Sequence, residues 1–370
     1  MSLRRLIVNK GEKVSNFFAF EMKNRYYRSL FNKEMARGFE GINNKLSKKY
    51  KLEIDNLWKK RYGIKVDKRW FAHYTHCYGV ESAYFIPDNI FHSIIEPYLN
   101  KDEYVSCMSN KNFFDKWLPQ LKHSCTFVRN IKGIWYDFEF NVLTEQQVLE
   151  KTNGYKEFVA KQCIDSAGGA GVIFVSEKLN LSTLKDLSKK FNQDFIFQEV
   201  IVQHEVLNQI NPSSVNTLRL MTLNYKGKVV LLSSILRMGI NGKRVDNMVS
   251  GGVNCAIRPD GTLVNKLYNA TGKFFDGHPN TGSVEGKVIP NFSKVVDTAI
   301  QAHKSLPYMG VISWDFALDV NENPILVEYN LKPQSLDFHQ RENGPIFGEM
   351  TVEILDDIFL KKGKKHGKEQ

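Results

Sequence analysis

The chain has 370 residues and a formal net charge of +11, with 42% hydrophobic and 25% charged residues. This length and composition predict one large domain or two to three smaller ones with a true core, and they exclude global disorder. Taken alone, so positive a charge suggests binding to nucleic acid, a membrane surface or an acidic substrate.

The positive charge lies at the two ends of the sequence. Residues 1–70 hold 19 Lys and Arg against 7 Asp and Glu, a net charge of +12, and residues 361–370 hold five Lys and one Glu. The body between them, residues 71–360, carries a net charge of −5. A mildly acidic body does not resemble a nucleic-acid-binding domain, so the basic ends need a separate explanation.

The five cysteines are dispersed without CxxC spacing, which favours reduced thiols in the cytosol over a disulfide framework or a zinc cluster. The apolar run after Arg4-Arg5 is too short for a signal peptide, and no apolar run approaches the roughly 18 residues of a membrane span. We therefore expect a cytoplasmic protein.

Residues 1–70 favour helix. A set of apolar side chains falls on one helical face: Phe17, Phe20, Tyr27, Phe31 and Met35. This pattern predicts an N-terminal helix packed on the body. A basic amphipathic helix at an anionic membrane surface is the alternative, which would place the protein at the inner face of the membrane, and nucleic-acid contact is a third hypothesis.

Residues 71–150 are predicted to contain short helices followed by an extended pair. Asn110 is a candidate N-cap for a helix that ends at Leu118, and Lys132-Gly133 is a candidate turn within residues 126–142.

Residues 156–331 contain short apolar runs separated by turn signals, which is typical of strands. The predicted strands are residues 158–164, 172–176, 195–202, 218–225, 229–237, 255–258, 263–267, 311–320 and 324–329, and the predicted helices are residues 182–192 and 292–305. Turns as short as Lys226-Gly227-Lys228 force antiparallel pairing, because a parallel crossover needs about a dozen residues or more. With neither a GxxxxGKS nor a GxGxxG motif, the sequence predicts an α+β fold with largely antiparallel sheets.

The first candidate site combines Lys161 with the glycine-rich turn Asp165–Gly171. Glycine permits close backbone approach and successive amides can point at phosphate oxygens, while the lysine supplies a compact positive charge. The alternative interpretation is an ordinary hairpin turn.

The second candidate site consists of Asp315, Glu328 and Asn330. Residues two apart on a strand share a face, and Asp315 lies on the preceding strand of the same predicted hairpin. Three oxygen ligands on paired strands suit magnesium. The alternative interpretation is a polar, solvated sheet face, although apolar residues flank both carboxylates.

Two further groups are weaker signals taken singly. One group consists of Asn216-Thr217-Leu218-Arg219, Arg237, Asp246-Asn247 and Gly251-Gly252. Its two arginines would suit bidentate recognition of phosphate or carboxylate, with surface salt bridges as the alternative. Residues 197–201 are predicted to form an edge strand that leaves a sheet and offers backbone groups able to read an adenine edge.

Taken in order, these pieces resemble the ATP-grasp superfamily of carboxylate ligases. The lysine and glycine loop is followed by the Gln-Glu strand, two arginines, Asn-x-x-x-Gly-Gly, an aspartate and Glu-x-Asn. The sequence before these residues is most similar to the sugar-transfer-associated ATP-grasp proteins. The matching stretches are Tyr84-Phe85-Ile86-Pro87-Asp88, Asn110-Lys111-Asn112, Phe127-Val128-Arg129-Asn130 and Ser214-Val215-Asn216-Thr217-Leu218-Arg219. The resemblance covers roughly residues 58–358.

The resemblance implies a role for each candidate residue. Lys111 and Lys161 would contact the ATP phosphates under a lid of Gly168, Gly169 and Gly171, and Arg219, Arg237 and Asn247 would face the reacting groups. The residues implied around the nucleoside are Gln198, Glu199, Ile201 and Glu205, and those implied for Mg²⁺, with Mn²⁺ as an alternative, are Asp315, Glu328 and Asn330. Glu205 departs from the family pattern in its offset from Glu199, and Gln162 stands where many relatives have Pro.

The resemblance also implies two α+β subdomains that clasp ATP, preceded by a helical basic region. The expected division is a basic helical region (1–70), a linker subdomain (71–150), a lid subdomain (151–205), a C-terminal subdomain with the metal site (206–360) and a basic disordered tail (361–370). The implied function is a carboxylate–amine ligase that acts on a sugar acid or glycan precursor in surface polysaccharide or capsule biosynthesis. A phosphotransferase and a non-catalytic nucleotide-binding subunit of a glycan-assembly complex are the alternatives.

Overall fold

The computed structural model describes residues 22, 25–26, 29–30, 45–164 and 171–360. The predicted N-terminal apolar face, the basic tail, Gly168 and Gly169 lie outside these residues. In the part of the chain that is described, no helix is both long enough and apolar enough to cross a membrane.

The chain folds into two compact units. One comprises the described residues before Asn100 together with those from Pro333 onward, and the other is the continuous segment Asn100–Lys332. The five-part division expected from the sequence stays a prediction.

The discontinuous unit is helical. Its elements are α2 (Lys48–Ile54), the π-helix η1 (Asp55–Arg61), α3 (Arg69–Tyr78), α4 (Asp88–Ile90), the π-helix η2 (Phe91–Ile95), α5 (Glu96–Leu99), α12 (Leu336–Asn343), the 3-10 helix η5 (Gly348–Met350) and α13 (Thr351–Phe359). The two chain segments are joined by side chains. Arg61 donates to Asp356 at 2.6 Å, and the amide of Gln340 bonds both the N–H and the C=O of Ile86 at 2.9 and 2.8 Å.

The continuous unit contains two sheets, and helices pack on one face of each sheet. Its strands are β1 (Lys122–His123), β2 (Thr126–Ile131), β3 (Ile134–Tyr136), β4 (Val142–Leu143), β5 (Phe158–Gln162), β6 (Val172–Val175), β7 (Asp194–Glu199), β8 (Thr217–Tyr225), β9 (Lys228–Met238), β10 (Val253–Ala256), β11 (Leu267–Asn269), β12 (Phe274–Phe275), β13 (Val311–Leu318) and β14 (Pro324–Asn330). Its helices are α6 (Asp102–Met108), η3 (Lys111–Phe113), α7 (Phe114–Trp117), α8 (Glu145–Thr152), α9 (Leu181–Lys190), α10 (Glu205–Ile210), η4 (Met248–Ser250) and α11 (Phe292–Lys304).

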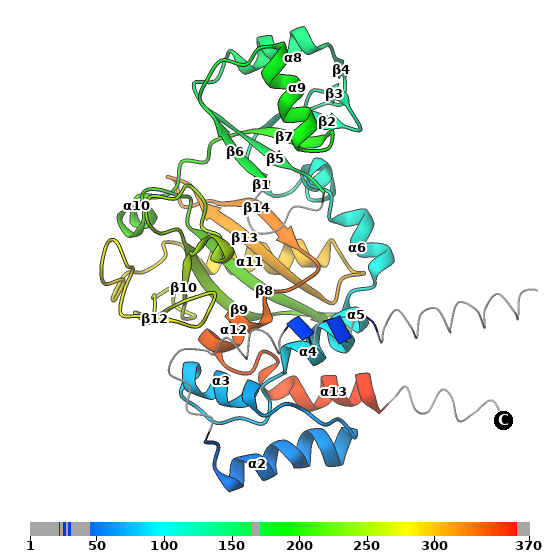
Figure 1. Cartoon of the computed structure of the whole chain (residues 1–370), viewed down its shortest axis with the longest axis vertical. Helices are drawn as coiled ribbons and strands as arrows, with labels where there is room; N and C mark the ends of the chain where they lie inside the picture. The colour runs from blue at the N-terminus through cyan, green and yellow to red at the C-terminus, as the bar shows by residue number, and fades with distance from the viewer. Residues whose placement is uncertain (1–21, 23–24, 27–28, 31–44, 165–170, 361–370) are drawn as a thin grey trace, which may run out of the picture. The chain divides into compact units, whose positions relative to one another are not determined.

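The strands form an eight-stranded sheet in the order β1-β14-β13-β8-β9-β10-β11-β12 and a six-stranded sheet in the order β4-β3-β2-β7-β5-β6 (Figure 1). Every pair is antiparallel except β1 with β14, which confirms the α+β class and the largely antiparallel sheets. Two hairpins close with two-residue turns, Lys132-Gly133 and Lys226-Gly227, in which both residues have positive φ. Such turns match the right-handed twist of the paired strands.

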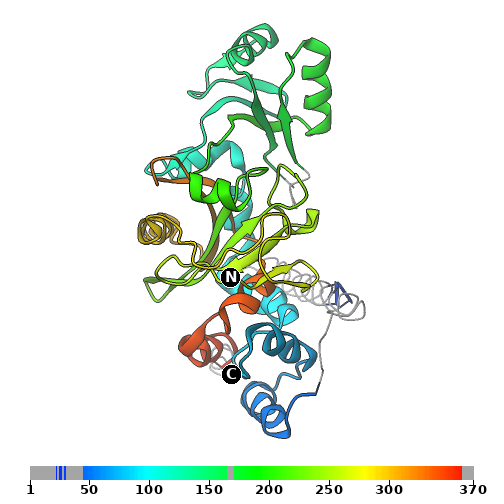
Figure 2. The same ribbon diagram turned by 90° about the vertical axis from the view of Figure 1, so that its left-hand side faces the viewer.

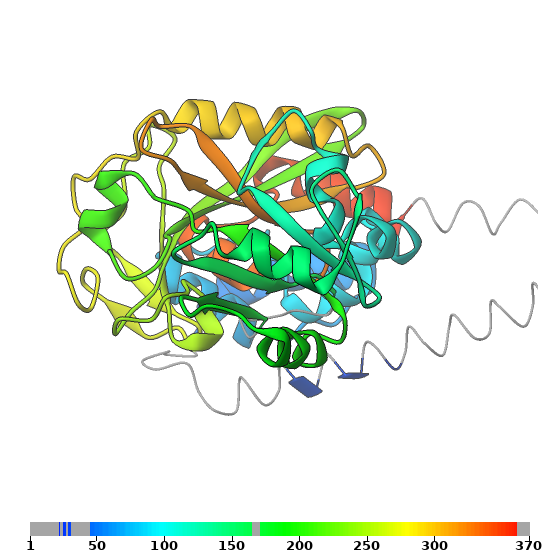
Figure 3. The same cartoon turned by 90° about the horizontal axis from the view of Figure 1, so that it is seen from above.

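Each sheet has one face that packs on a hydrophobic core and an opposite face that does not. Leu218, Leu220 and Trp314 of the eight-stranded sheet belong to a cluster that includes Val295 and Ala299 of α11. Figures 2 and 3 show α11, in yellow-orange, against this face. In the six-stranded sheet a second cluster joins the aromatic residues of β2, β5 and β7 to α8 and α9. Because side chains alternate along a strand, the intervening residues point to the opposite faces.

Two expectations about strands are wrong. β7 is not an edge strand, because it lies between β2 and β5. Residues 263–267 do not form a strand of their own. Leu263 and Thr262 make isolated bridges, to Ile257 and Val288, and the next strand begins only at Leu267.

Candidate active site

The face of the eight-stranded sheet opposite α11 carries a row of charged side chains. Arg219 on β8 is in register with Asp315 on β13, and Asp315 is in register with Glu328 on β14. Hydrophobic neighbours in the same strands point to the core. A β-bulge between the Asp315 and Phe316 pairs turns Glu328 to the face of Asp315, although Leu326, two residues earlier, points to the core.

Asp315 is the centre of this row and is only 1% exposed. Its carboxylate accepts two hydrogen bonds from Arg219, at 2.7 and 2.5 Å, one from Arg237 at 3.2 Å and one from Asn330 at 3.3 Å. The interpretation of Arg219 and Arg237 as surface salt bridges is therefore wrong, and so is the interpretation of Asp315 as part of a solvated face.

The charges of the two arginines determine the ionisation of Asp315. Burial alone would raise the pKa of this carboxyl, but the guanidinium groups of Arg219 and Arg237 outweigh burial and hold the pKa below its usual value. A buried carboxylate held between two cations is stable only as long as every partner is present.

A second carboxylate continues the cluster beyond the sheet. Asp246 follows β9 in the chain, accepts a hydrogen bond from Thr217 and lies 3.7 Å from the guanidinium of Arg237. Its pKa is raised, mainly by burial and against the opposing charge of Arg237. Arg237 is therefore shared by two carboxylates.

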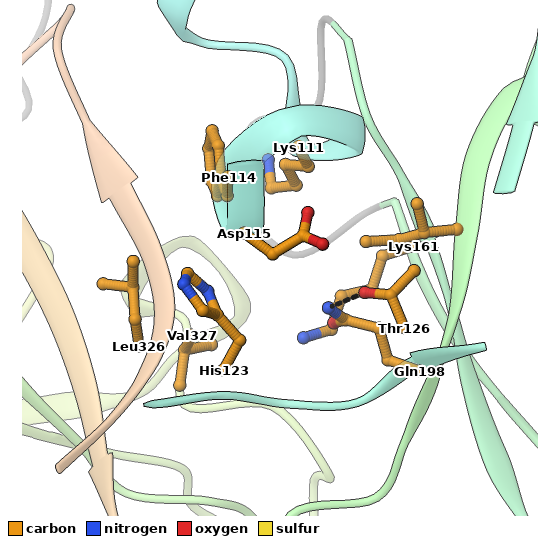
Figure 4. Close-up of a pocket in the computed structure, with 10 residues that line it drawn as sticks. Lys111, Phe114, Asp115, His123, Thr126, Lys161, Gln198, Leu326 and Val327 are labelled. Atoms are coloured by element: carbon orange, nitrogen blue, oxygen red, sulfur yellow. Dashed lines mark hydrogen bonds between the residues drawn. The ribbon is translucent and has the colours of Figure 1, made fainter. Parts of the chain in front are cut away.

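A pocket lies beside this row and is lined from both sheets (Figure 4). The six-stranded sheet contributes Thr126, Lys161, Ile196 and Gln198, and the eight-stranded sheet contributes His123, Leu326 and Val327. Lys111, Phe114 and Asp115 of η3 and α7 complete the lining.

Two lysines bring positive charge to this pocket. The ammonium of Lys111 lies 3.5 Å from Glu328, whose other oxygen is 4.0 Å from Arg219. Burial lowers the pKa of Lys161 to about 8, Glu328 opposes this shift, and the nearby charge of Lys111 adds to it. The pocket is thus electrostatically suited to an anion, which would raise the pKa of Lys161 again.

Gln198 lies on the pocket face of β7 with its amide orientation fixed. Its nitrogen donates to the hydroxyl of Thr126 at 2.9 Å (Figure 4) and to the carbonyl of Ser124 at 3.4 Å. Its oxygen is buried without a hydrogen-bond partner. A buried acceptor of this kind is costly unless a donor meets it.

A buried ion pair positions the segment that carries Lys111. Arg129 on β2 donates to Asp115 at 2.5 Å and to the carbonyl of Asn112. Because Arg129 is fully buried, this contact fixes η3 and α7 against the six-stranded sheet. Asn110 caps η3 by accepting from the N–H of Asn112, as the sequence predicts for a helix starting there.

The structure brings most of the predicted site residues together. The residues that line the pocket or join the charged row are Lys111, Lys161, Gln198, Arg219, Arg237, Asp315, Glu328 and Asn330. Asn247 follows Asp246 in the loop after β9, and Gly171 closes the β5–β6 hairpin by accepting from the N–H of Gln162. Their functional roles stay predictions.

Three predicted residues lie elsewhere. Glu199 ends β7 with an exposed side chain, Ile201 lies just beyond it, and Glu205 begins α10 and is exposed. None of them is among the described residues that line the pocket.

Sequence reasoning missed several contributors. Thr126, His123 and Asp115 line the pocket. Thr217 and Asp246 belong to the stretches singled out around Arg219 and Arg237, and their contact extends the charged cluster. A charged Arg129 inside an apolar run was the signal for the buried pair with Asp115. The sequence offers no comparable signal for His123.

The donor set at Asp315, Glu328 and Asn330 suits a hard divalent cation, because it offers two carboxylates and an amide oxygen from one sheet face. No cluster of three or more His, Cys, Asp or Glu side chains placed for a metal occurs in the described ranges, so the amide is needed to complete the set. Glu328, with 30% of its side chain exposed, is the more available of the two carboxylates.

A family model described as sugar-transfer associated ATP-grasp matches residues 96–353. No curated protein matches the chain.

Solved structures with similar folds include three ligase-type proteins. A D-alanyl-alanine synthetase A from Vibrio cholerae is 11% identical, with 70% of this chain and 67% of that chain covered at a TM-score of 0.43. A D-alanine–D-alanine ligase from Coxiella burnetii is 10% identical, with 70% and 61% covered at 0.41. The 2-oxoglutarate carboxylase biotin carboxylase domain of Hydrogenobacter thermophilus is 13% identical, with 63% and only 42% covered at 0.39.

Replacement of Asp315 tests the buried charge cluster. Asp315→Asn should lower the free energy of unfolding by about 3–5 kcal/mol at pH 7, because two buried guanidinium groups lose their shared carboxylate. Since folding lowers the pKa of Asp315, its contribution is present above its unfolded value of about 4 and is lost as the pH falls through the native value. Urea unfolding at several pH values measures both effects. Asp356→Asn, which removes the partner of exposed Arg61, is the control and should cost about 1 kcal/mol or less. Equal losses in the two variants would contradict the analysis.

Proposed function

The chain belongs to the sugar-transfer associated ATP-grasp family, and on that premise we propose that it is an ATP- and magnesium-dependent carboxylate–amine ligase. The observation that carries the proposal is the continuity of charge from the pocket to the sheet. Lys111 contacts Glu328, Glu328 lies near Arg219, and Arg219 shares Asp315 with Arg237.

The proposed reaction has two steps. A substrate carboxylate oxygen attacks the γ-phosphorus of ATP, so that an acyl phosphate forms and ADP leaves. An amine then attacks the acyl carbon, loses a proton and expels inorganic phosphate. Neither step needs a nucleophile from the protein, because positioning and charge neutralisation dominate phosphoryl transfer.

The proposed roles follow the sides of the pocket. Lys111 and Lys161 bind the phosphates, with Gly168, Gly169 and Gly171 covering them. Arg219, Arg237 and Asn247 face the transferred phosphate and the acyl phosphate. The residues proposed around the nucleoside are Gln198, Glu199, Ile201 and Glu205. Of these four, Gln198 has direct support, since it lines the pocket with an unsatisfied acceptor.

Asp315, Glu328 and Asn330 would hold Mg²⁺, with Mn²⁺ as the alternative. When bound, the metal supplies positive charge to the phosphate oxygens. Arg219 and Arg237 neutralise Asp315, so they keep the ligand face organised.

The proposed acid substrate is a sugar acid or a glycan precursor, and the setting is surface polysaccharide or capsule assembly in the cytoplasm. This part rests on the family description alone. A phosphotransferase would use the same nucleotide and metal residues and differs only in stopping after the first step.

The reaction is tested with ATP, Mg²⁺, hydroxylamine and a panel of sugar acids. We expect ADP release and a trapped hydroxamate, measured by a coupled assay and by mass spectrometry. A stable phosphorylated product would support the phosphotransferase, and the absence of ADP with every acid would support a non-catalytic nucleotide-binding protein.

Glu328→Gln should reduce ADP release by at least about 100-fold while circular dichroism stays unchanged, because the metal that binds the phosphates loses a ligand. Surviving turnover would show that the metal site is wrongly placed.

The lowered pKa of Lys161 predicts a pH dependence of nucleotide binding. Phosphates bind the charged lysine, so the affinity for ATP should fall about tenfold between pH 7 and pH 9, as the ammonium loses its proton around pH 8. Titration with a fluorescent ATP analogue measures this change. Lys161→Arg keeps its charge throughout and should remove most of the decline. An equal decline in both proteins would mean that another group titrates.

We also propose that the basic N-terminal region contacts anionic membrane surfaces. The proposal rests on the net charge of +12 in residues 1–70. Deletion of residues 1–40 should weaken sedimentation with vesicles containing phosphatidylserine, and should leave binding to neutral vesicles unchanged. Unaltered binding to anionic vesicles would contradict the proposal.

A further inference from the structure

The loop between β9 and β10, residues 239–252, contacts the six-stranded sheet and the residue that precedes β5 through Arg244. This loop, called the Asp246 loop below, carries Asn247 and Asp246, and Asp246 lies 3.7 Å from the guanidinium of Arg237. None of the proposed catalytic roles uses its exposed residue Arg244.

The Asp246 loop is held tightly at its base. A Cβ atom at Gly239 would lie 2.7 Å from the Ser214 hydroxyl and 2.8 Å from the carbonyl of Val245. A Cβ atom at Gly252 would lie 2.7 Å from the carbonyl of Asp246 and 2.8 Å from that of Met238. Both ends therefore require glycine, and the loop is fixed to the eight-stranded sheet as a compact piece.

Arg244 reaches from this piece to the six-stranded sheet. Its guanidinium donates twice to Glu157, at 2.5 and 2.7 Å, and its Cζ lies 3.6 Å from the centre of the Phe174 ring. Bidentate pairing and stacking on an aromatic ring are both specific to arginine.

Glu157 is itself oriented by the sheet. It immediately precedes β5, the strand that carries Lys161, and one of its oxygens also accepts from Ser176 at 2.7 Å, just beyond β6. The hydrogen bond from Arg244 is the main reason that the pKa of Glu157 falls to about 2, so the pair stays charged throughout the physiological range.

We propose that Arg244 and Glu157 form a latch that holds the Asp246 loop against the β5–β6 hairpin and slows the release of nucleotide from the pocket. While it is closed, the latch holds the loop that carries Asp246 and Asn247 near β5, the strand that carries Lys161. Arg244 and Glu157 are positioning residues, because they act through these groups.

The exposure of the pair makes the latch reversible. The side chains of Arg244 and Glu157 are 45% and 28% exposed, so water and salt screen their attraction. An exposed pair of this kind breaks easily. A contact that must break before nucleotide can exchange needs this property.

The chain provides a matched control in its other unit. Arg61 and Asp356 also form a bidentate pair, with side chains 45% and 30% exposed. Removal of Arg61 therefore deletes an equally exposed ion pair that lies far along the sequence from the Asp246 loop.

The first experiment uses the nucleotide-free full chain. Hydrogen–deuterium exchange of peptides from residues 239–252 should become about fivefold faster in Arg244→Ala and Glu157→Gln, and should not change in Arg61→Ala. The charge swap that combines Arg244→Glu with Glu157→Arg should recover part of the protection. Unchanged exchange in both single variants would overturn the latch.

The second experiment measures the dissociation rate of a fluorescent ATP analogue with Mg²⁺, chased by excess ATP. Dissociation should be about fivefold faster in Arg244→Ala and Glu157→Gln than in the wild type and Arg61→Ala, and rising salt should narrow the difference. Equal rates would overturn the effect of the latch on release.

The inference rests on the proposed function, but different results would refute the proposed function and the latch. A wild type that binds no analogue would refute the proposed nucleotide site, while the exchange experiment still decides whether the latch exists.

Discussion

The pairing of Asp315 with Arg219 and Arg237 is the interaction on which the site depends. These three charges come from three adjacent strands and are all less than 8% exposed, so none can be solvated in place of its partners. Burying them costs desolvation free energy that only close mutual pairing offsets. A protein that needed only stability would do as well with apolar residues there, which is why the cluster indicates function.

The second constraint is the alternation of side chains along the strands. In both sheets of the continuous unit one face is closed by helices, α11 on one sheet and α8 with α9 on the other. The opposite faces carry the polar residues and line one pocket. Period-two alternation thus separates packing from chemistry within single strands such as β8, where Leu218 and Leu220 serve the core and Thr217 and Arg219 serve the site.

Much of this arrangement could be predicted from the sequence. The hairpin around Asn321-Glu322-Asn323 is read directly from its turn residues, and it places Asp315 and Glu328 on neighbouring strands. The β-bulge that brings these two residues opposite each other could not be predicted, because a regular hairpin would pair Asp315 with Val327. The position of β7 could not be predicted, because the strands on either side of it are separated from it by helices and loops, and local patterns do not reveal which strands pair. The burial of Arg219 and Arg237 depends on long-range pairing in the same way. Glu205, whose role was implied by the resemblance although its offset from Glu199 departs from the family pattern, lies on an exposed helix turn outside the described pocket lining.

The division of the chain into a continuous and a discontinuous unit has a consequence for synthesis. The continuous unit is complete once Lys332 has been made, whereas the helical unit needs α12 and α13, which are translated afterwards. Until then α3 lacks the contacts of its buried His73 and Tyr74 with the α12 region, and Ile86 lacks Gln340. Domains generally fold in the order in which they leave the ribosome, so the sheets that hold the charged row would form first. The earlier helices would meanwhile expose their apolar faces, which makes this interval the one in which the nascent chain most needs protection by chaperones.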